Sequence, residues 1–510
     1  MRDSEIKRLQ EIELEIKRIA EDIGLTTTEI DFEIVSSRRM IEAMAYRFPT
    51  NFSHWSFGRD YDRIRTIYEH KGAGIPYEVV WNFKPPKAFL VETNPTALNI
   101  LVIAHVYGHV DFNMENKFLK RAADCHDLSR EARSAERRFR KYEKLYNLDS
   151  YEKTVEAAFT LDGYHSPDGM MERESDDKLK ERMIKMKMER VKDLQRREFD
   201  RDKDELFKIR KEIQKLRRAD PPIPRYDILN YILEKSPKPL SYWQEDIVST
   251  IRDQGKFFDY QKRSKLLNEG WATLIHSKIM RRLYKEGFIT QEEYQEYSQF
   301  HSKVVRKSKA TLNWYNIGLA LYKDLIHRWN RGMHGKSFDE SKDPYKWSSW
   351  NSEDNAGMEK AFEVRKNYTD RMAVESFFDE EFIRDAQIYI WEKRRDPRTG
   401  TIKYVIAEDD PKVIKKMLQN TLSLYGKPTI KVQDGDYNRN RELYLKHEFT
   451  GFELDPRFES GALENVYYLW GRPVHLETVE IVEDEDTGKK RLRGILHSYD
   501  GKKHKIDKEP

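Results

Sequence analysis

The chain has 510 residues, and its 93 Lys and Arg residues nearly balance its 89 Asp and Glu residues, so the net charge is only +4. This balance gives no electrostatic argument for nucleic acid binding, and an aromatic content of 12% argues against a disordered chain. The single cysteine, Cys125, excludes an intramolecular disulfide and a cysteine-rich zinc cluster, as is typical of a reducing compartment.

The sequence contains no segment that suggests export or insertion into a membrane. Its first residues are charged, and they are not followed by the apolar core of a secretory signal. No uncharged apolar run reaches the length that spans a membrane. We therefore expect a cytoplasmic protein with no membrane partner.

The first hundred residues alternate between helix and strand patterns. An apolar stripe over residues 4–22 predicts an amphipathic helix, and an alternating pattern over 28–35 predicts a half-buried strand. Two further helices are expected at 37–48 and 60–70. The strands of a hairpin that leads into the next helix are expected at 77–83 and 88–93.

The apolar run at 97–112 predicts a buried helix that carries two histidines. His105 and His109 are four residues apart, so they lie on the same face, roughly 6 Å from each other. Such a pair is either half of a metal site or two hydrogen-bonded core histidines, and for a single pair the second interpretation is the more common. Asp111, at the end of the run, either orients an imidazole as a hydrogen-bond acceptor or ends the helix.

Charged residues dominate the segment from 170 to 222, which has no Gly or Pro between Gly169 and Pro221. This composition predicts a long charged helix or a helical hairpin. Its small excess of basic residues could serve a protein or RNA partner, but a solvated helix face is the more common reason for such a pattern.

A second apolar helix, expected at 266–280, carries Glu269 and His276 on one face, seven residues apart. The small residues Ala272 and Thr273 between them leave space for another group next to the two polar side chains. An isolated buried glutamate would be energetically costly.

The two helices together offer His105, His109, Glu269 and His276, all of types that bind first-row divalent metals. If the helices cross in the core, the four side chains make a metal site, and this combination favours a metal over a purely structural role.

The chain changes character near residue 376, after which strand patterns dominate. We expect an α+β fold with a mainly helical core, a few strands near the N-terminus, a charged helical insertion and a smaller C-terminal α+β domain. The predicted segments are 1–169 and 223–375 for the two parts of the core, 170–222 for the insertion and 376–510 for the C-terminal domain. The strands and the one helix expected in the last segment lie near 386–392, 401–407, 411–422 (the helix), 429–432, 442–448, 474–482 and 490–498.

Two segments resemble the hallmark segments of the stage V sporulation protein R (SpoVR) family. They are the run from His105 to Phe112 and the run from Asn268 to His276. The resemblance extends from about Glu15 to Trp391. Further matching motifs lie at 52–58, 74–82, 313–318 and 327–329, and departures from the family pattern lie at Asn113 and Tyr260.

The resemblance implies a cytoplasmic bacterial or archaeal protein that is linked, in spore formers, to assembly of the spore cortex peptidoglycan. It also implies two partners, a PrkA-type serine protein kinase and a von Willebrand factor A-like protein. The resemblance does not imply any established reaction.

A metal-dependent hydrolase is the first functional hypothesis. Zinc with an open coordination position lowers the pKa of its bound water toward 7 and polarises a carbonyl group. Val106 stands where His-Glu-x-x-His enzymes place their general base. The base would therefore be another carboxylate, and Glu269 and Asp111 are the candidates.

Three alternatives stay open from the residues alone. If all four side chains bind one metal, the site is closed and structural. Two histidines and a carboxylate are also the ligands of non-haem iron. A third possibility is a scaffold or adaptor that works with a kinase or ATPase partner through the charged helix and the C-terminal domain.

Overall fold

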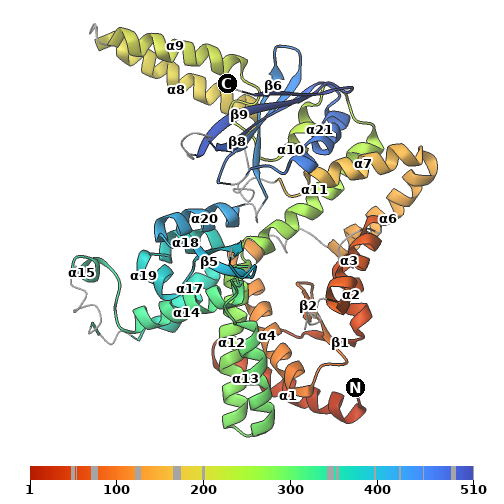
Figure 1. Ribbon diagram of the computed structural model, residues 1–510, viewed down its shortest axis with the longest axis vertical. Coiled ribbons are helices and arrows are strands. Elements are labelled where there is room, and N and C mark those ends of the chain that lie inside the picture. The colour runs from red at the N-terminus through yellow and green to blue at the C-terminus, as the bar shows by residue number, and fades with distance from the viewer. Residues whose placement is uncertain are drawn as a thin grey trace. The chain divides into compact units, whose positions relative to one another are not determined.

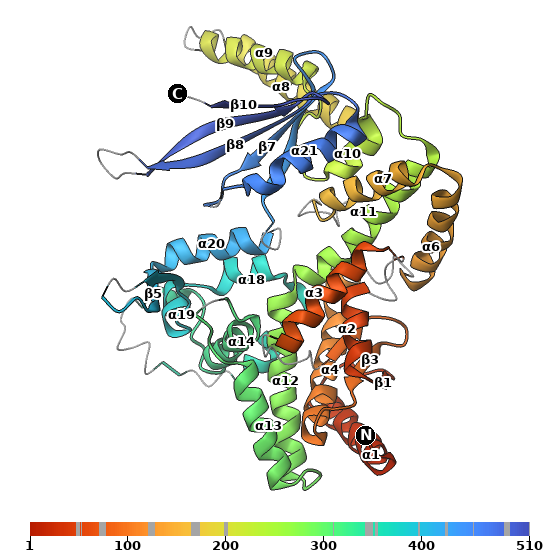
Figure 2. The ribbon, with the colours of Figure 1, turned by 45° about the vertical axis from the view of Figure 1, so that its right-hand side comes forward.

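The protein, in a computed structural model, is mainly helical, with three separate sheets among the described residues, which confirms the predicted fold class. Figure 1 and Figure 2 show the elements coloured along the chain. The structure describes residues 1–46, 52, 54–70, 78–120, 128–164, 174–197, 202–309, 311–341, 350–351, 355–395, 398–423, 427–451, 453–483 and 490–508.

The chain forms two compact units, each built from two separate stretches. Unit 1 contains Met1–Glu136 and Tyr260–Tyr425, and unit 2 contains Arg137–Asp259 and Gly426–Pro510. The units therefore do not follow the predicted segments, because residues 137–259 of unit 2 span parts of three of them.

Three helices form the centre of unit 1, and α12 (Lys265–Lys285) packs between α4 (Thr96–Glu115) and α14 (Trp314–Asn330). Every residue of α4 from 97 to 113 is buried, because the sequence there is apolar on all sides of the helix. The helices α1 (Asp3–Asp22) and α13 (Gln291–Val304) pack against α4 as well. The helix α4, which carries His105 and His109, is thus buried inside unit 1.

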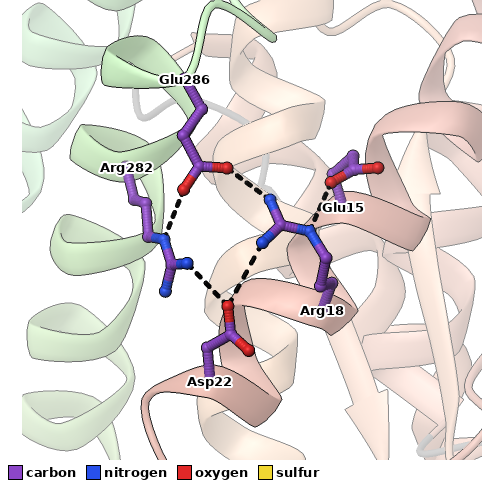
Figure 3. Close-up of polar contacts among 5 residues, drawn as sticks. All are labelled: Glu15, Arg18, Asp22, Arg282 and Glu286. Carbon is purple, nitrogen blue, oxygen red and sulfur yellow. Dashed lines mark hydrogen bonds and ion pairs between the residues drawn. The ribbon is translucent and has the colours of Figure 1, made fainter.

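A network of charged side chains ties α1 to the C-terminal end of α12 (Figure 3). Arg282 contacts Asp22 and Glu286, each at 2.6 Å, and Arg18 contacts Asp22 at 3.2 Å and Glu15 at 2.8 Å. Arg18 also pairs with Glu286. Because these side chains are partly exposed, the pairs contribute modestly to stability, and they fix α1 at the end of α12 that is remote from Glu269.

The N-terminal strands form a three-stranded sheet in the order β1-β3-β2. β3 (Lys87–Val91) pairs antiparallel with β2 (Glu78–Trp81), which confirms the predicted hairpin. β1 (Asp31–Val35) pairs with β3 in parallel. The sheet packs against α2 (Ser37–Tyr46), which in turn packs against α3 (Ser56–His70).

Unit 2 contains a five-stranded sheet in the order β10-β9-β8-β7-β6, in which only β7 and β8 are parallel. The helix α21 (Pro456–Trp470) connects these two strands and packs on β8 and β9. Neither α21 nor β10 was expected from the sequence. The strands are β6 (Thr429–Tyr437), β7 (Glu442–Glu448), β8 (Val474–Glu483), β9 (Lys490–Tyr499) and β10 (His504–Lys508).

The charged segment forms a helical hairpin in unit 2, as one of the two predicted alternatives requires. Its helices, α8 (Asp176–Arg197) and α9 (Asp202–Arg218), lie side by side (Figure 1). The other described helices of unit 2 are α7 (Leu148–Leu161), α10 (Ile228–Lys235), the second half of α6 (Leu128–Leu145) and most of α11 (Tyr242–Lys262).

The predicted boundary near residue 376 is placed too early. The helix α20 (Pro411–Ser423) packs in unit 1 on α18 (Asp370–Phe377) and α19 (Glu380–Asp385), because its apolar residues Ile414, Leu418 and Leu422 join the core of that unit. The remaining described elements of unit 1 are α15 (Lys336–Asp339), α17 (Gly357–Asn367) and the strand pair β4 (Ile390–Arg395) and β5 (Ile402–Glu408). Among the described residues, no helix is both long and apolar enough to cross a membrane.

Candidate metal centre

The helices α4 and α12 meet at a glycine, which brings their polar side chains together. A Cβ atom added to Gly108 would lie 2.7 Å from the Cα of Ala272, and real Cβ atoms do not approach a backbone atom so closely. The small residue Ala272 therefore accommodates α4 itself. The space predicted between Glu269 and His276 is filled by this helix contact.

Three of the four predicted ligands converge beside this contact. The Oε2 atom of Glu269 lies 3.6 Å from Nε2 of His105 and 3.5 Å from Nε2 of His109. One potential ligand atom from each of the three side chains lies within 4.8 Å of the other two. All three side chains are nearly buried, so the cluster lies inside unit 1.

His276 does not join the cluster but lies behind His105. Its Nδ1 atom is 2.9 Å from Nδ1 of His105, and its Nε2 atom is 2.9 Å from Nδ1 of His301 on α13. The physical reason is the rise of the helix, because seven residues separate Glu269 from His276 by about 10.5 Å along the axis. His301 was missed because it lies in a polar stretch with no apolar pattern around it.

Asn268 fixes the orientation of His109. Its Oδ1 atom lies 2.8 Å from Nδ1 of His109, and an amide oxygen only accepts hydrogen bonds. Nδ1 of His109 is therefore the protonated nitrogen, which leaves the lone pair of Nε2 on the side of Glu269. A partner on the far nitrogen is the usual way to orient a metal-binding imidazole.

Asp111 has a different role from the two that were expected. It accepts hydrogen bonds from Nε1 of Trp271 and from the backbone N–H of Thr26, both at 2.8 Å, and it pairs with Arg365. It neither contacts an imidazole in these bonds nor ends α4, which continues to Glu115. Asp111 ties α4 to its neighbours, so it is a poor candidate for a general base.

His109 and Glu269 are in the ionisation states that a metal requires. Burial lowers the pKa of His109 to about 4, so its imidazole is neutral at physiological pH. Burial alone would raise the pKa of Glu269, but the adjacent imidazoles of His105 and His109 outweigh it and the net shift is downward. Metal binding needs neutral imidazoles and an ionised carboxylate.

The three side chains could together hold a cation. The Oε2 atom of Glu269 is buried, faces the Nε2 atoms of both histidines and accepts no hydrogen bond from the part of the chain that the structure describes. Zinc binds nitrogen and oxygen at about 2.0–2.1 Å, so the corners of its tetrahedron lie about 3.3 Å apart. The observed separations of 3.5 and 3.6 Å are close to this spacing.

Comparisons with known proteins cover nearly the whole chain. The family profile described as SpoVR like protein matches residues 3–427, and the profile described as SpoVR-like C-terminal domain matches residues 428–481. The chain is also similar to the uncharacterized protein YcgB of Escherichia coli (strain K12), with 26% identity over 484 residues, 91% of this chain and 90% of the relative. No solved structure matches the chain.

Proposed function

The chain belongs to the SpoVR family, and on this premise we propose that it binds one divalent metal ion through His105, His109 and Glu269 and acts as a metal-dependent hydrolase. The observation that carries the proposal is the convergence of the two imidazoles on the buried carboxylate of Glu269. Two histidines and a glutamate are also the ligands of catalytic zinc in helical peptidases.

The number of ligands favours a catalytic role over a closed structural site. A structural zinc has four protein ligands, whereas a catalytic zinc has three and keeps one position for water. His276 is hydrogen-bonded behind His105, so three protein ligands remain among the described residues. A zinc ion held by His105, His109 and Glu269 would lower the pKa of a bound water to about 7, so part of this water would be ionised at neutral pH without a protein base. Hydrolysis would then not depend on a glutamate at the position of Val106, where His-Glu-x-x-His zinc peptidases have one.

Zinc is the first candidate metal and iron the second. Ligand atoms on adjacent corners of an octahedron lie about 2.9 Å apart at the same bond length of about 2.0–2.1 Å. The separations of 3.5 and 3.6 Å in this site are closer to the tetrahedral spacing of zinc. A site with two histidines and one carboxylate is nevertheless typical of non-haem iron, and metal analysis distinguishes the two.

The proposed substrates are peptide or peptidoglycan-precursor amides. This choice follows from the link of the family to the spore cortex, and zinc activates amide carbonyls for attack by hydroxide. A cytoplasmic location fits precursors better than the assembled cortex.

Metal analysis of the purified full-length protein tests the proposal. We expect one zinc ion per chain, and we expect His105→Ala to lose it. His447→Ala is the matched control, because His447 is a buried histidine in unit 2 that is hydrogen-bonded to Thr478. The proposal fails if neither zinc nor iron is present in stoichiometric amount and His105→Ala leaves both metal content and stability unchanged.

A second candidate function is that of an adaptor for a PrkA-type serine protein kinase and a von Willebrand factor A-like protein. The feature that supports it is the hairpin of α8 and α9, which has 16 basic and 9 acidic residues. Phe207 on this hairpin is 71% exposed. Pull-down with the purified kinase, with and without charge reversal on α9, tests this function, and it fails if charge reversal leaves binding unchanged.

A further inference from the structure

Three histidines from three helices form a chain of imidazoles that starts at the candidate metal centre. Nδ1 of His105 on α4 faces Nδ1 of His276 on α12 at 2.9 Å, and Nε2 of His276 faces Nδ1 of His301 on α13 at 2.9 Å. The ring centroids are 5.1 and 5.2 Å apart. Each contact joins two ring nitrogens, so in each one nitrogen donates a proton and the other accepts it.

A metal on His105 would fix the direction of both hydrogen bonds. If Nε2 of His105 binds the metal, the proton of this imidazole must be on Nδ1, and Nδ1 of His276 must accept it. His276 then carries its own proton on Nε2 and donates it to Nδ1 of His301. One arrangement of tautomers thus satisfies the whole chain.

The surroundings hold His276 in the orientation that this arrangement needs. The side chain is 2% exposed, and the ring of Tyr297 packs edge-on against it with centroids 6.2 Å apart. Held in this way, the ring keeps Nδ1 toward His105 and Nε2 toward His301.

We propose that His276 is a positioning residue, which holds His105 as the tautomer with a proton on Nδ1 and thereby directs the lone pair of Nε2 to the metal. This inference rests on the proposed metal site and adds the residue that orients one of its ligands. Partners of this kind are nearly as important as the ligands, and their removal typically lowers metal affinity about 10- to 100-fold.

Two substitutions at His276 separate positioning from packing. The side-chain oxygen of an asparagine can occupy the place of Nδ1, so His276→Asn keeps an acceptor for His105. The amide of a glutamine reaches the place of Nε2, so His276→Gln keeps the contact with His301 and removes the acceptor for His105. We expect zinc affinity to fall about 10- to 100-fold in His276→Gln and to stay near that of the original protein in His276→Asn.

Zinc titration of the metal-depleted full-length protein, with a chelator as competitor, measures these affinities. Equal zinc affinity of the two variants, whether high or low, would overturn the inference, because packing alone would not distinguish the amides. If the unsubstituted protein binds no zinc, the proposed function fails instead. The two failures are therefore distinguishable.

Imidazole nitrogen NMR of the unsubstituted protein, labelled only in histidine, gives a second readout that needs no folded variant. We expect zinc-loaded protein to show His105 protonated on Nδ1 and His276 protonated on Nε2. A zinc-loaded His105 with its proton on Nε2 would contradict the inference. A purely structural role of His276 would set no particular tautomer of His105.

Discussion

Replacing Gly108 by alanine should separate α4 from α12 and thereby disrupt the candidate metal centre. The new Cβ atom would lie 2.7 Å from Cα and 3.1 Å from Cβ of Ala272. The first of these neighbours is a backbone atom, so no change of rotamer relieves the contact. The helices must therefore move apart by several tenths of an ångström.

The structure sets the size of the change in stability and of the change in zinc affinity. Overpacking of a buried contact costs about 1–3 kcal/mol, whereas alanine gains about 1 kcal/mol over glycine in helix propensity. The separation must grow from 2.7 Å to an ordinary contact of at least 3.4 Å. A similar shift of Glu269 away from the histidines would widen 3.5 and 3.6 Å to about 4.2 Å, well beyond the zinc spacing of about 3.3 Å. We expect zinc affinity to fall at least about tenfold.

Gly461→Ala is the matched control. Gly461 lies within the helix α21, and a Cβ atom added there meets nothing within 4 Å. Both variants gain the same helix propensity, so their difference in unfolding free energy isolates the helix contact. Urea unfolding and zinc titration of both variants measure the two effects. If Gly108→Ala matched Gly461→Ala in stability and kept the original zinc affinity, the assigned contact between α4 and α12 would be refuted.

Three further predictions concern single polar groups. Glu269→Gln should abolish the stabilisation by zinc, which is about 2.7 kcal/mol at a concentration of 100 times Kd; thermal unfolding with and without zinc measures this loss. The unfolding free energy of the metal-free protein should fall by about 3 kcal/mol as the pH falls from 6.5 to 4, because the unfolded chain then binds a proton that folded His109, with its pKa of about 4, does not. A pH series of urea unfolding should show a smaller loss in His109→Asn. An equal loss in this variant would contradict the low pKa assigned to His109. Asp111→Asn should lower the unfolding free energy by about 3 kcal/mol, because Arg365 then keeps only Glu115, at 3.8 Å, as an acidic contact among the described residues. Zinc titration of the folded variant should give an unchanged affinity. A loss of zinc binding would restore Asp111 as a site residue.

The local elements of the site were predictable because they depend on short-range periodicity. The continuous apolar run of α4 and the four-residue spacing of its histidines determine both its burial and its shared polar face. Glu269 was identified for the same reason, as a carboxylate on an otherwise apolar helix. These signals are independent of how the chain folds over long distances.

Spacing on one helix face alone could not predict which of the candidate ligands lie together. The shared face of Glu269 and His276 suggested a single site, but the rise of about 10.5 Å over seven residues keeps them apart. The close approach at Gly108 depends on a residue of another helix, Ala272. His301 lies on a third helix and has no local signal, so only the fold reveals its contact with His276.

The C-terminal part shows the opposite case, in which a local signal was present but was not used. Asp455 and Pro456 are a typical helix start, and Gly471, with φ of 76°, is a typical helix end. These residues mark α21, the connection between the parallel strands β7 and β8. When this helix is overlooked, the sequence predicts only a series of consecutive strands and gives no reason for β7 and β8 to be parallel.

Anomalous diffraction at the zinc edge, from crystals of the zinc-loaded full-length protein, tests the central claim most directly. The account predicts one peak about 2 Å from Nε2 of His105, Nε2 of His109 and a carboxylate oxygen of Glu269, with His276 outside the coordination sphere. Absence of a peak between α4 and α12, or a peak that includes His276 as a fourth ligand, would contradict an open three-ligand site.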